Sequence, residues 1–103
     1  MKRVYISFPY DEPLLDKMLL NEITNDLLRQ GNILPISPIH LFYYLDMDNG
    51  IRKIISKTCY ELIKICDEVY IYNYGKLSLG QLEDYYFCSE LDKPMTIKNK
   101  EGI

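Results

Sequence analysis

Apolar residues gather in short runs along the chain, and longer stretches with helical spacing lie between these runs. Residues 2–8 alternate and are rich in β-forming residues, and a proline follows them, which predicts a first strand. Short runs at 32–36, 67–74 and 94–97 predict three further strands. The run at 67–74 is apolar enough for the centre of a sheet.

Three helices are predicted between these strands. The first follows Asp11 as its N-cap and ends at Gly31. Its apolar stripe consists of Leu15, Met18, Leu19, Ile23 and Leu27. The second covers residues 51–66, and its stripe consists of Ile51, Ile54, Ile55, Thr58, Cys59, Leu62 and Ile65. The third opens at Ser78 and runs to about Leu91, and Leu79 and Leu82 are expected to hold it on the sheet.

The alternation of strands and helices predicts an α/β protein with a small Rossmann-like three-layer fold. We expect a parallel sheet of about four strands in the order 2-1-3-4, with right-handed crossovers. Ligands bind such sheets beyond the carboxyl ends of the strands. The segments SFPYDE (7–12), PISPIH (35–40) and YNYGKLSLGQLED (72–84) should therefore meet at one pocket. PISPIH is expected to be an extended loop.

Composition and charge exclude several classes of protein. The chain has 103 residues, of which 48% are hydrophobic, so one domain with one core is expected. Its net charge of −3 gives no basic footprint for duplex nucleic acid. No apolar run approaches the ~20 residues of a membrane helix, and the first residues resemble a strand more than a signal peptide.

The cysteines and the histidine give no sign of a metal site. Cys59, Cys66 and Cys88 have no metal-like spacing, so buried free thiols in a reducing cytoplasm are the favoured interpretation. His40 is the only histidine, and it is either a ligand contact or a hydrogen-bonded structural residue. No cofactor and no metal is expected.

The segment around Ser78 is the strongest candidate for ligand binding. A helix N-terminus attracts anions, Ser78 can add a hydroxyl donor, and Gly80 lets a ligand approach the backbone. The alternative is that Ser78 is only an N-cap. Glu83 and Asp84 follow on the next turn, where either a catalytic carboxylate or a favourable helix-dipole charge would explain them.

Several segments together resemble nucleoside 2-deoxyribosyltransferases and small bacterial and phage proteins related to them. VYISFPY is similar to their first strand and loop, PISPIH to their second loop, and CDEVYIY to their third strand. SLGQLEDYYFCSELDKPM is similar to their Ser-x-Gly-x-x-x-Glu helix and the strand after it. The likeness covers about residues 3–97 and implies a single 2-deoxyribosyltransferase-like domain over 1–103.

The resemblance implies a nucleoside or nucleotide ligand and a helix carboxylate that attacks C1′ of a deoxyribosyl group. It implies that Ser78 and Gly80 contact the sugar 5′ end or its phosphate. The glutamate position of the motif falls on Asp84, and Glu83 comes one residue early. Three hypotheses follow: Asp84 is the nucleophile, a helix irregularity brings Glu83 in, or the site is inactive. We favour Asp84 and expect Glu83 to be the more exposed.

The other residues expected to contact the ligand are Ser7, Pro9, Tyr10, Asp11, His40 and Tyr74. Tyr10, Tyr43 and Tyr44 lie in loops and are candidates for stacking on a base. The aromatic segment LFYYL (41–45) predicts a homodimer, because exposed aromatics are a liability on a monomer. Two functions stay open: cleavage or transfer of an N-glycosidic bond, or an inactive relative that binds a nucleotide or a host protein partner.

Overall fold

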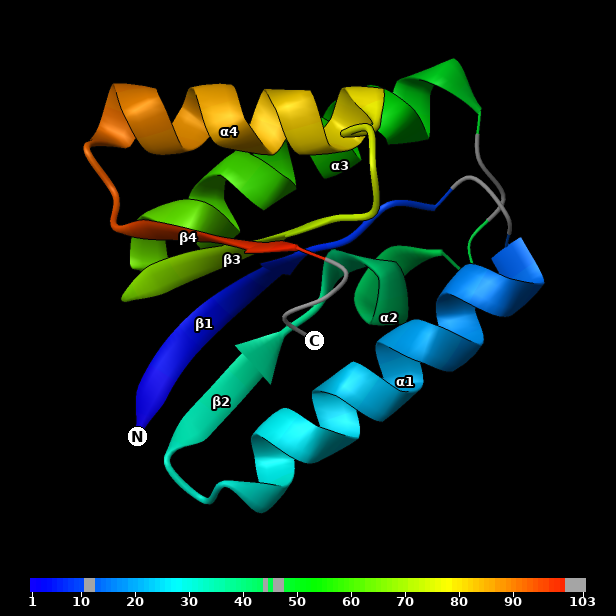
Figure 1. Ribbon diagram of the computed structural model, residues 1–103. Helices are drawn as coiled ribbons and strands as arrows, with labels where there is room; N and C mark the ends of the chain where they lie inside the picture. Colours follow the sequence, from blue (N-terminus) through cyan, green and yellow to red (C-terminus); the bar gives the residue numbers. More distant parts are fainter. Residues whose placement is uncertain (11–12, 44, 46–47, 100–103) are drawn as a thin grey trace.

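The computed structural model describes residues 1–10, 13–43, 45 and 48–99. The four strands β1 (Lys2–Ser7), β2 (Ile33–Ile36), β3 (Glu68–Asn73) and β4 (Met95–Asn99) form one parallel sheet in the order β2-β1-β3-β4 (Figure 1). Tyr5 pairs with Ile36 on one side and with Val69 on the other, so β1 is an inner strand. The predicted α/β class and strand order are confirmed.

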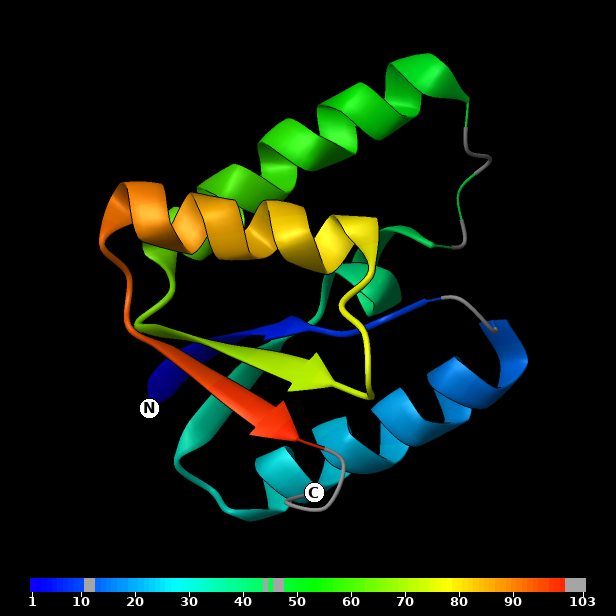
Figure 2. The same cartoon turned by 45° about the horizontal axis from the view of Figure 1, so that its top comes forward.

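Helices cover both faces of the sheet. The main helices are α1 (Pro13–Arg29), α3 (Asn49–Ile65) and α4 (Leu79–Leu91). Figure 2 shows α3 and α4 side by side over one face and α1 below the other. The core is correspondingly split. One cluster joins Leu20 and Ile23 of α1 to the sheet, and the other joins Ile63 of α3 and Cys88 of α4 to it.

The second loop contains a short helix that was not predicted. PISPIH was expected to be extended, but α2 (Pro38–Phe42) begins within it. Ser37 caps this helix, because its hydroxyl oxygen accepts a hydrogen bond from the His40 backbone N–H at 3.5 Å. Pro38 occupies the first turn, where a missing N–H is tolerated and the fixed φ suits a helix.

The predicted apolar stripes are partly wrong. In α1, Leu15 and Met18 are exposed, and Leu20 is buried with Ile23 and Leu27. The first turns of α1 extend past the ends of the strands, so apolar residues there find no sheet to cover (Figure 1). In α3, the buried residues are Cys59 and Ile63, whereas Ile54 and Ile65 are exposed.

All three cysteines are free and buried, as predicted. Burial raises the pKa of each thiol to about 11, so the thiols are neutral and behave as small apolar side chains. None of the helices among the described residues combines the length and the apolarity needed to cross a membrane.

Candidate active site

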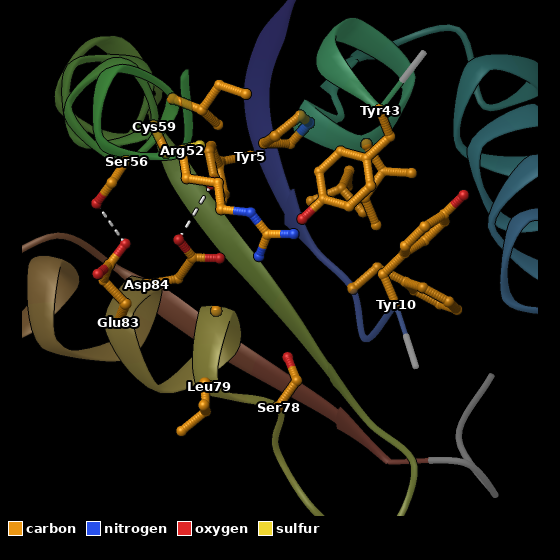
Figure 3. Close-up of a pocket in the computed structure, with 16 residues that line it drawn as sticks. Tyr5, Tyr10, Tyr43, Arg52, Ser56, Cys59, Ser78, Leu79, Glu83 and Asp84 are labelled. Atoms are coloured by element: carbon orange, nitrogen blue, oxygen red, sulfur yellow. Dashed lines mark hydrogen bonds between the residues drawn. The ribbon is translucent and has the colours of Figure 1, made fainter. Parts of the chain in front are cut away.

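A cavity of about 500 Å³ opens at the carboxyl end of β1 (Figure 3). Its walls come from β1 and the loop after it, from α2, from α3 and from the start of α4. Its hydroxyl and charged side chains come mainly from Tyr5, Arg52, Ser56, Ser78, Glu83 and Asp84. Each of the three predicted segments contributes to the cavity lining. The lining residues from these segments are Phe8 and Tyr10, Pro38 and Ile39, and Ser78 and Gly80.

Asp84 is the most strongly perturbed acid of the cavity. Its Oδ2 accepts a hydrogen bond from Ser7 Oγ at 2.7 Å, and its Oδ1 accepts one from the Tyr5 hydroxyl at 3.1 Å. Burial raises the pKa of Asp84 to about 7, and the charge of Glu83 adds to this rise. The two hydrogen bonds favour the ionised form, so they oppose the rise in the pKa. The carboxyl group is therefore held in a fixed orientation and titrates near neutral pH.

Glu83 points to a different neighbour. Its Oε1 accepts a hydrogen bond from Ser56 Oγ of α3 at 2.6 Å, which links α3 to α4 at the cavity wall. Glu83 is exposed and Asp84 is partly buried, as expected for neighbours that point about 100° apart on a helix.

A capping box forms at the N-terminus of α4. Ser78 Oγ accepts a hydrogen bond from the Gln81 backbone N–H at 3.2 Å, and Gln81 Oε1 accepts one from the Ser78 N–H at 3.0 Å. The next two backbone N–H groups, of Leu79 and Gly80, have no acceptor within the helix. The helix end thus presents donors and its positive dipole end to the cavity.

Gln81, and not the neighbouring leucines, holds the first turn of α4 on the sheet. Leu79 and Leu82 were expected to do so, but they are exposed, with 86% and 49% of their surfaces accessible. Gln81 is only 1% exposed. Its Nε2 donates to the carbonyl oxygens of Ser7 at 3.1 Å and Tyr72 at 2.6 Å, at the ends of β1 and β3. A satisfied amide replaces apolar packing because unpaired strand-end carbonyls lie beneath the helix.

Gly80 has no structural need to be a glycine. A Cβ atom built there would meet nothing closer than Ser78 Oγ at 4.0 Å, and its φ is not in the left-handed region. Gly80 lines the cavity, so the open space beside its backbone is available to a closely approaching ligand.

Some predicted residues lie elsewhere. Within the described residues, His40 Nε2 is 2.5 Å from Asn21 Oδ1, outside the cavity wall. Tyr74 packs against Phe8, with ring centroids 5.3 Å apart, on the α1 side of the sheet. Ser7 does not line the cavity, but its hydroxyl donates a hydrogen bond to Asp84, which does. Pro9 is buried and does not line the cavity. Asp11 and Tyr44 lie outside the described residues.

The aromatic end of the cavity is built from two loops. Tyr10 and Tyr43 meet edge to face, with ring centroids 4.6 Å apart. Burial raises the pKa of the Tyr43 hydroxyl, and the nearby charge of Arg52 opposes that rise. Sequence reasoning placed Tyr10 and Tyr43 here but missed Tyr5, Arg52, Ser56 and Gln81. A signal existed for α3, since Arg52, Ser56 and Cys59 recur at the four- and three-residue steps of one helix face.

No family model matches the chain, and no curated protein matches its sequence. Solved structures do match. A 2-desoxiribosyltransferase from Leishmania mexicana superposes with a TM-score of 0.70 over 96% of this chain, at 14% identity. The chain has the fold of that transferase. It spans 65% of the transferase's length, so the match covers a part of the larger protein.

A second match is a CMP N-glycosidase from Clostridium botulinum, with a TM-score of 0.66 and 17% identity. This likeness covers 95% of this chain and 71% of the N-glycosidase. At these identities the two superpositions show a shared fold. The chemistry of this chain has to be argued from its own cavity.

Proposed function

We propose that the protein breaks the N-glycosidic bond of a deoxynucleoside or of its 5′-monophosphate, by hydrolysis or by transfer to another base. The observation that carries this proposal is the fixed carboxyl group of Asp84 in a cavity at the end of β1, beside the open donors of α4. The fold supports it, because both matching structures are named for deoxyribosyl transfer or N-glycosidic cleavage.

In this mechanism the Asp84 carboxylate attacks C1′ of the sugar. The C1′–N bond breaks, its electron pair leaves with the base, and the base takes a proton from water. The resulting ester between Asp84 and the sugar is then attacked by water, or by a nitrogen of a second base, which restores the carboxylate. Tyr5 and Ser7 orient the attacking oxygens throughout, because each donates a hydrogen bond to the carboxylate.

The other walls of the cavity suit the rest of a nucleoside. The free N–H groups after Ser78 would hold the 5′ hydroxyl or phosphate, and the space at Gly80 admits it. The aromatic pair Tyr10 and Tyr43, with Ile39, offers an apolar surface for the base.

Only the ionised form of Asp84 can attack, so its raised pKa has a kinetic consequence. With a pKa of about 7 in the empty site, the active fraction rises as the pH increases through neutrality. The rate of base release at low substrate concentration should follow this fraction, rising through about pH 7 and levelling above it.

The proposal is tested by incubating the protein with a panel of deoxynucleosides and their monophosphates and measuring free base. We expect release from the wild-type protein, loss of release in Asp84→Asn, and a substantial remaining rate in Glu83→Gln. Loss in Glu83→Gln alone would move the nucleophile to Glu83. If no substrate releases base but one binds, the alternative holds, in which the protein is an inactive nucleotide-binding or protein-binding factor.

A homodimer is the second part of the proposal. Leu41, Tyr43 and Leu45 are each between 39% and 45% exposed and lie next to the cavity wall formed by α2. A second copy covering this segment would bury apolar surface and narrow the aromatic end of the cavity.

A further inference from the structure

Arg52 is a positive charge in the cavity that the proposed mechanism has not used. It comes from the first turn of α3, and Figure 3 shows its guanidinium reaching into the cavity on the side of Asp84 and Tyr43, with Ser78 across the cavity. Within the part of the chain that the structure describes, the Arg52 backbone N–H donates to the Asp48 carbonyl oxygen at 3.0 Å, whereas no hydrogen bond or ion pair engages its guanidinium.

The neighbouring acids are already committed. Glu83 accepts the hydrogen bond of Ser56, and Asp84 accepts those of Tyr5 and Ser7. The guanidinium therefore keeps its five N–H donors for an incoming acceptor, on an exposed side chain at the cavity wall.

The positions of the α4 N-terminus, Asp84 and Arg52 along the cavity indicate which part of a bound nucleoside would reach Arg52. If the sugar 5′ end lies at the α4 N-terminus and C1′ lies at Asp84, the base extends to the opposite side. Arg52 and Tyr43 lie there. The charge of Arg52 is also felt at Tyr43, since it opposes the burial-driven rise in the pKa of that hydroxyl.

We infer that Arg52 hydrogen-bonds the departing base and stabilises the negative charge that the base acquires when the C1′–N bond breaks. This inference rests on the proposed function and names its leaving group: a base with a carbonyl acceptor beside the glycosidic nitrogen, such as uracil. The electron pair of the broken bond spreads onto that carbonyl oxygen. Arg52 keeps its own proton, and the base is protonated by water.

A leaving-group comparison tests this role. Arg52→Met removes the charge and the donors but keeps a stem of similar shape, and Arg52→Lys keeps the charge. Lys53→Met is the matched control, because Lys53 is the adjacent exposed cation and does not line the cavity. Each variant is assayed with 2′-deoxyuridine and with 5-fluoro-2′-deoxyuridine, whose base is more acidic and needs less stabilisation.

We expect Arg52→Met to lower kcat for 2′-deoxyuridine by about 10²–10³, the effect of removing one preorganised donor of this kind. The loss of kcat with the fluorinated substrate should be at least about tenfold smaller. The kcat of Arg52→Lys for 2′-deoxyuridine should lie between those of the wild type and Arg52→Met. The kcat of Lys53→Met should match that of the wild type. An equal loss with both substrates would overturn the inference, as would a loss confined to monophosphates, which would assign Arg52 to the phosphate. No base release by the wild type would overturn the proposed function and this inference together.

Discussion

Replacing Asp84 by asparagine should make the protein more stable at alkaline pH while it destroys the proposed activity. The pKa of Asp84 rises from its ordinary value of 3.8 to about 7 in the folded protein, chiefly because of burial. A difference of about three pKa units, at about 1.4 kcal/mol each, sets an upper limit of about 4 kcal/mol on the destabilisation by the ionised group. Because the side chain is only partly buried, we expect about 2–4 kcal/mol.

The direction in which stability changes with pH depends on whether the folded or the unfolded chain holds the proton of Asp84 more tightly. Below about pH 4 the carboxyl group is neutral in both folded and unfolded chains, and it adds no penalty. Between about pH 4 and pH 7 the unfolded chain loses the proton and the folded chain keeps it, so the stability of the wild type falls as pH rises. Asparagine has no charge to desolvate, and it can still exchange hydrogen bonds with Tyr5 and Ser7, whose hydroxyls both donate and accept.

Urea unfolding followed by circular dichroism measures this directly. At about pH 8, Asp84→Asn should unfold with a free energy about 2–4 kcal/mol above that of the wild type, and at about pH 4.5 the gain should shrink to about 1 kcal/mol or less. Glu83→Gln makes the same chemical change one residue away at an exposed position and should shift the free energy by less than about 0.5 kcal/mol at both pH values. A destabilised Asp84→Asn at pH 8, or a difference that does not change with pH, would refute the reasoning.

The remaining predictions concern binding, position and assembly. Gly80→Ala should leave stability unchanged or raise it by up to about 1 kcal/mol, because the Cβ meets nothing closer than Ser78 Oγ at 4.0 Å. Isothermal titration should show weaker nucleotide binding by this variant, and unchanged affinity would remove Gly80 from the site. Gln81→Leu should destabilise the fold by about 1–3 kcal/mol in thermal unfolding, since it leaves the carbonyl oxygens of Ser7 and Tyr72 without their donor, and a stable variant would contradict the role assigned to Gln81. Light scattering should show a dimer that Leu41→Lys weakens, and a monomer at high concentration would count against this.

The fold was predictable because each strand and each long helix carries its own local signal. The strand at 67–74 and the stop at Gly31 are examples, and alternation with right-handed crossovers then limits the sheet order to few choices. The errors fall where local pattern and tertiary contact disagree. Leu15 and Met18 have helical spacing with Ile23, but the helix turn that carries them lies beyond the sheet, and spacing alone contains no information on where the sheet ends.

The candidate site was predictable only in outline. The rule that ligands bind at strand carboxyl ends brought Tyr10, Ser78 and Asp84 to one cavity. It did not separate His40 from them, because the unpredicted helix α2 turns that side chain towards Asn21. Arg52 was missed because α3 also carries Lys53, Lys57 and Lys64, and cations on a helix usually mark its solvated face. Only the position of α3 in the fold shows that Arg52 reaches the cavity.

The most direct test of the central claim is to look for the sugar on Asp84. Wild-type protein mixed with a deoxynucleoside 5′-monophosphate that it cleaves, quenched in acid and digested, should give a peptide containing Asp84 that carries the deoxyribosyl group by mass spectrometry. The same peptide from Asp84→Asn should be unmodified. A sugar found on Glu83, or base release without any modified peptide, would contradict Asp84 as the nucleophile.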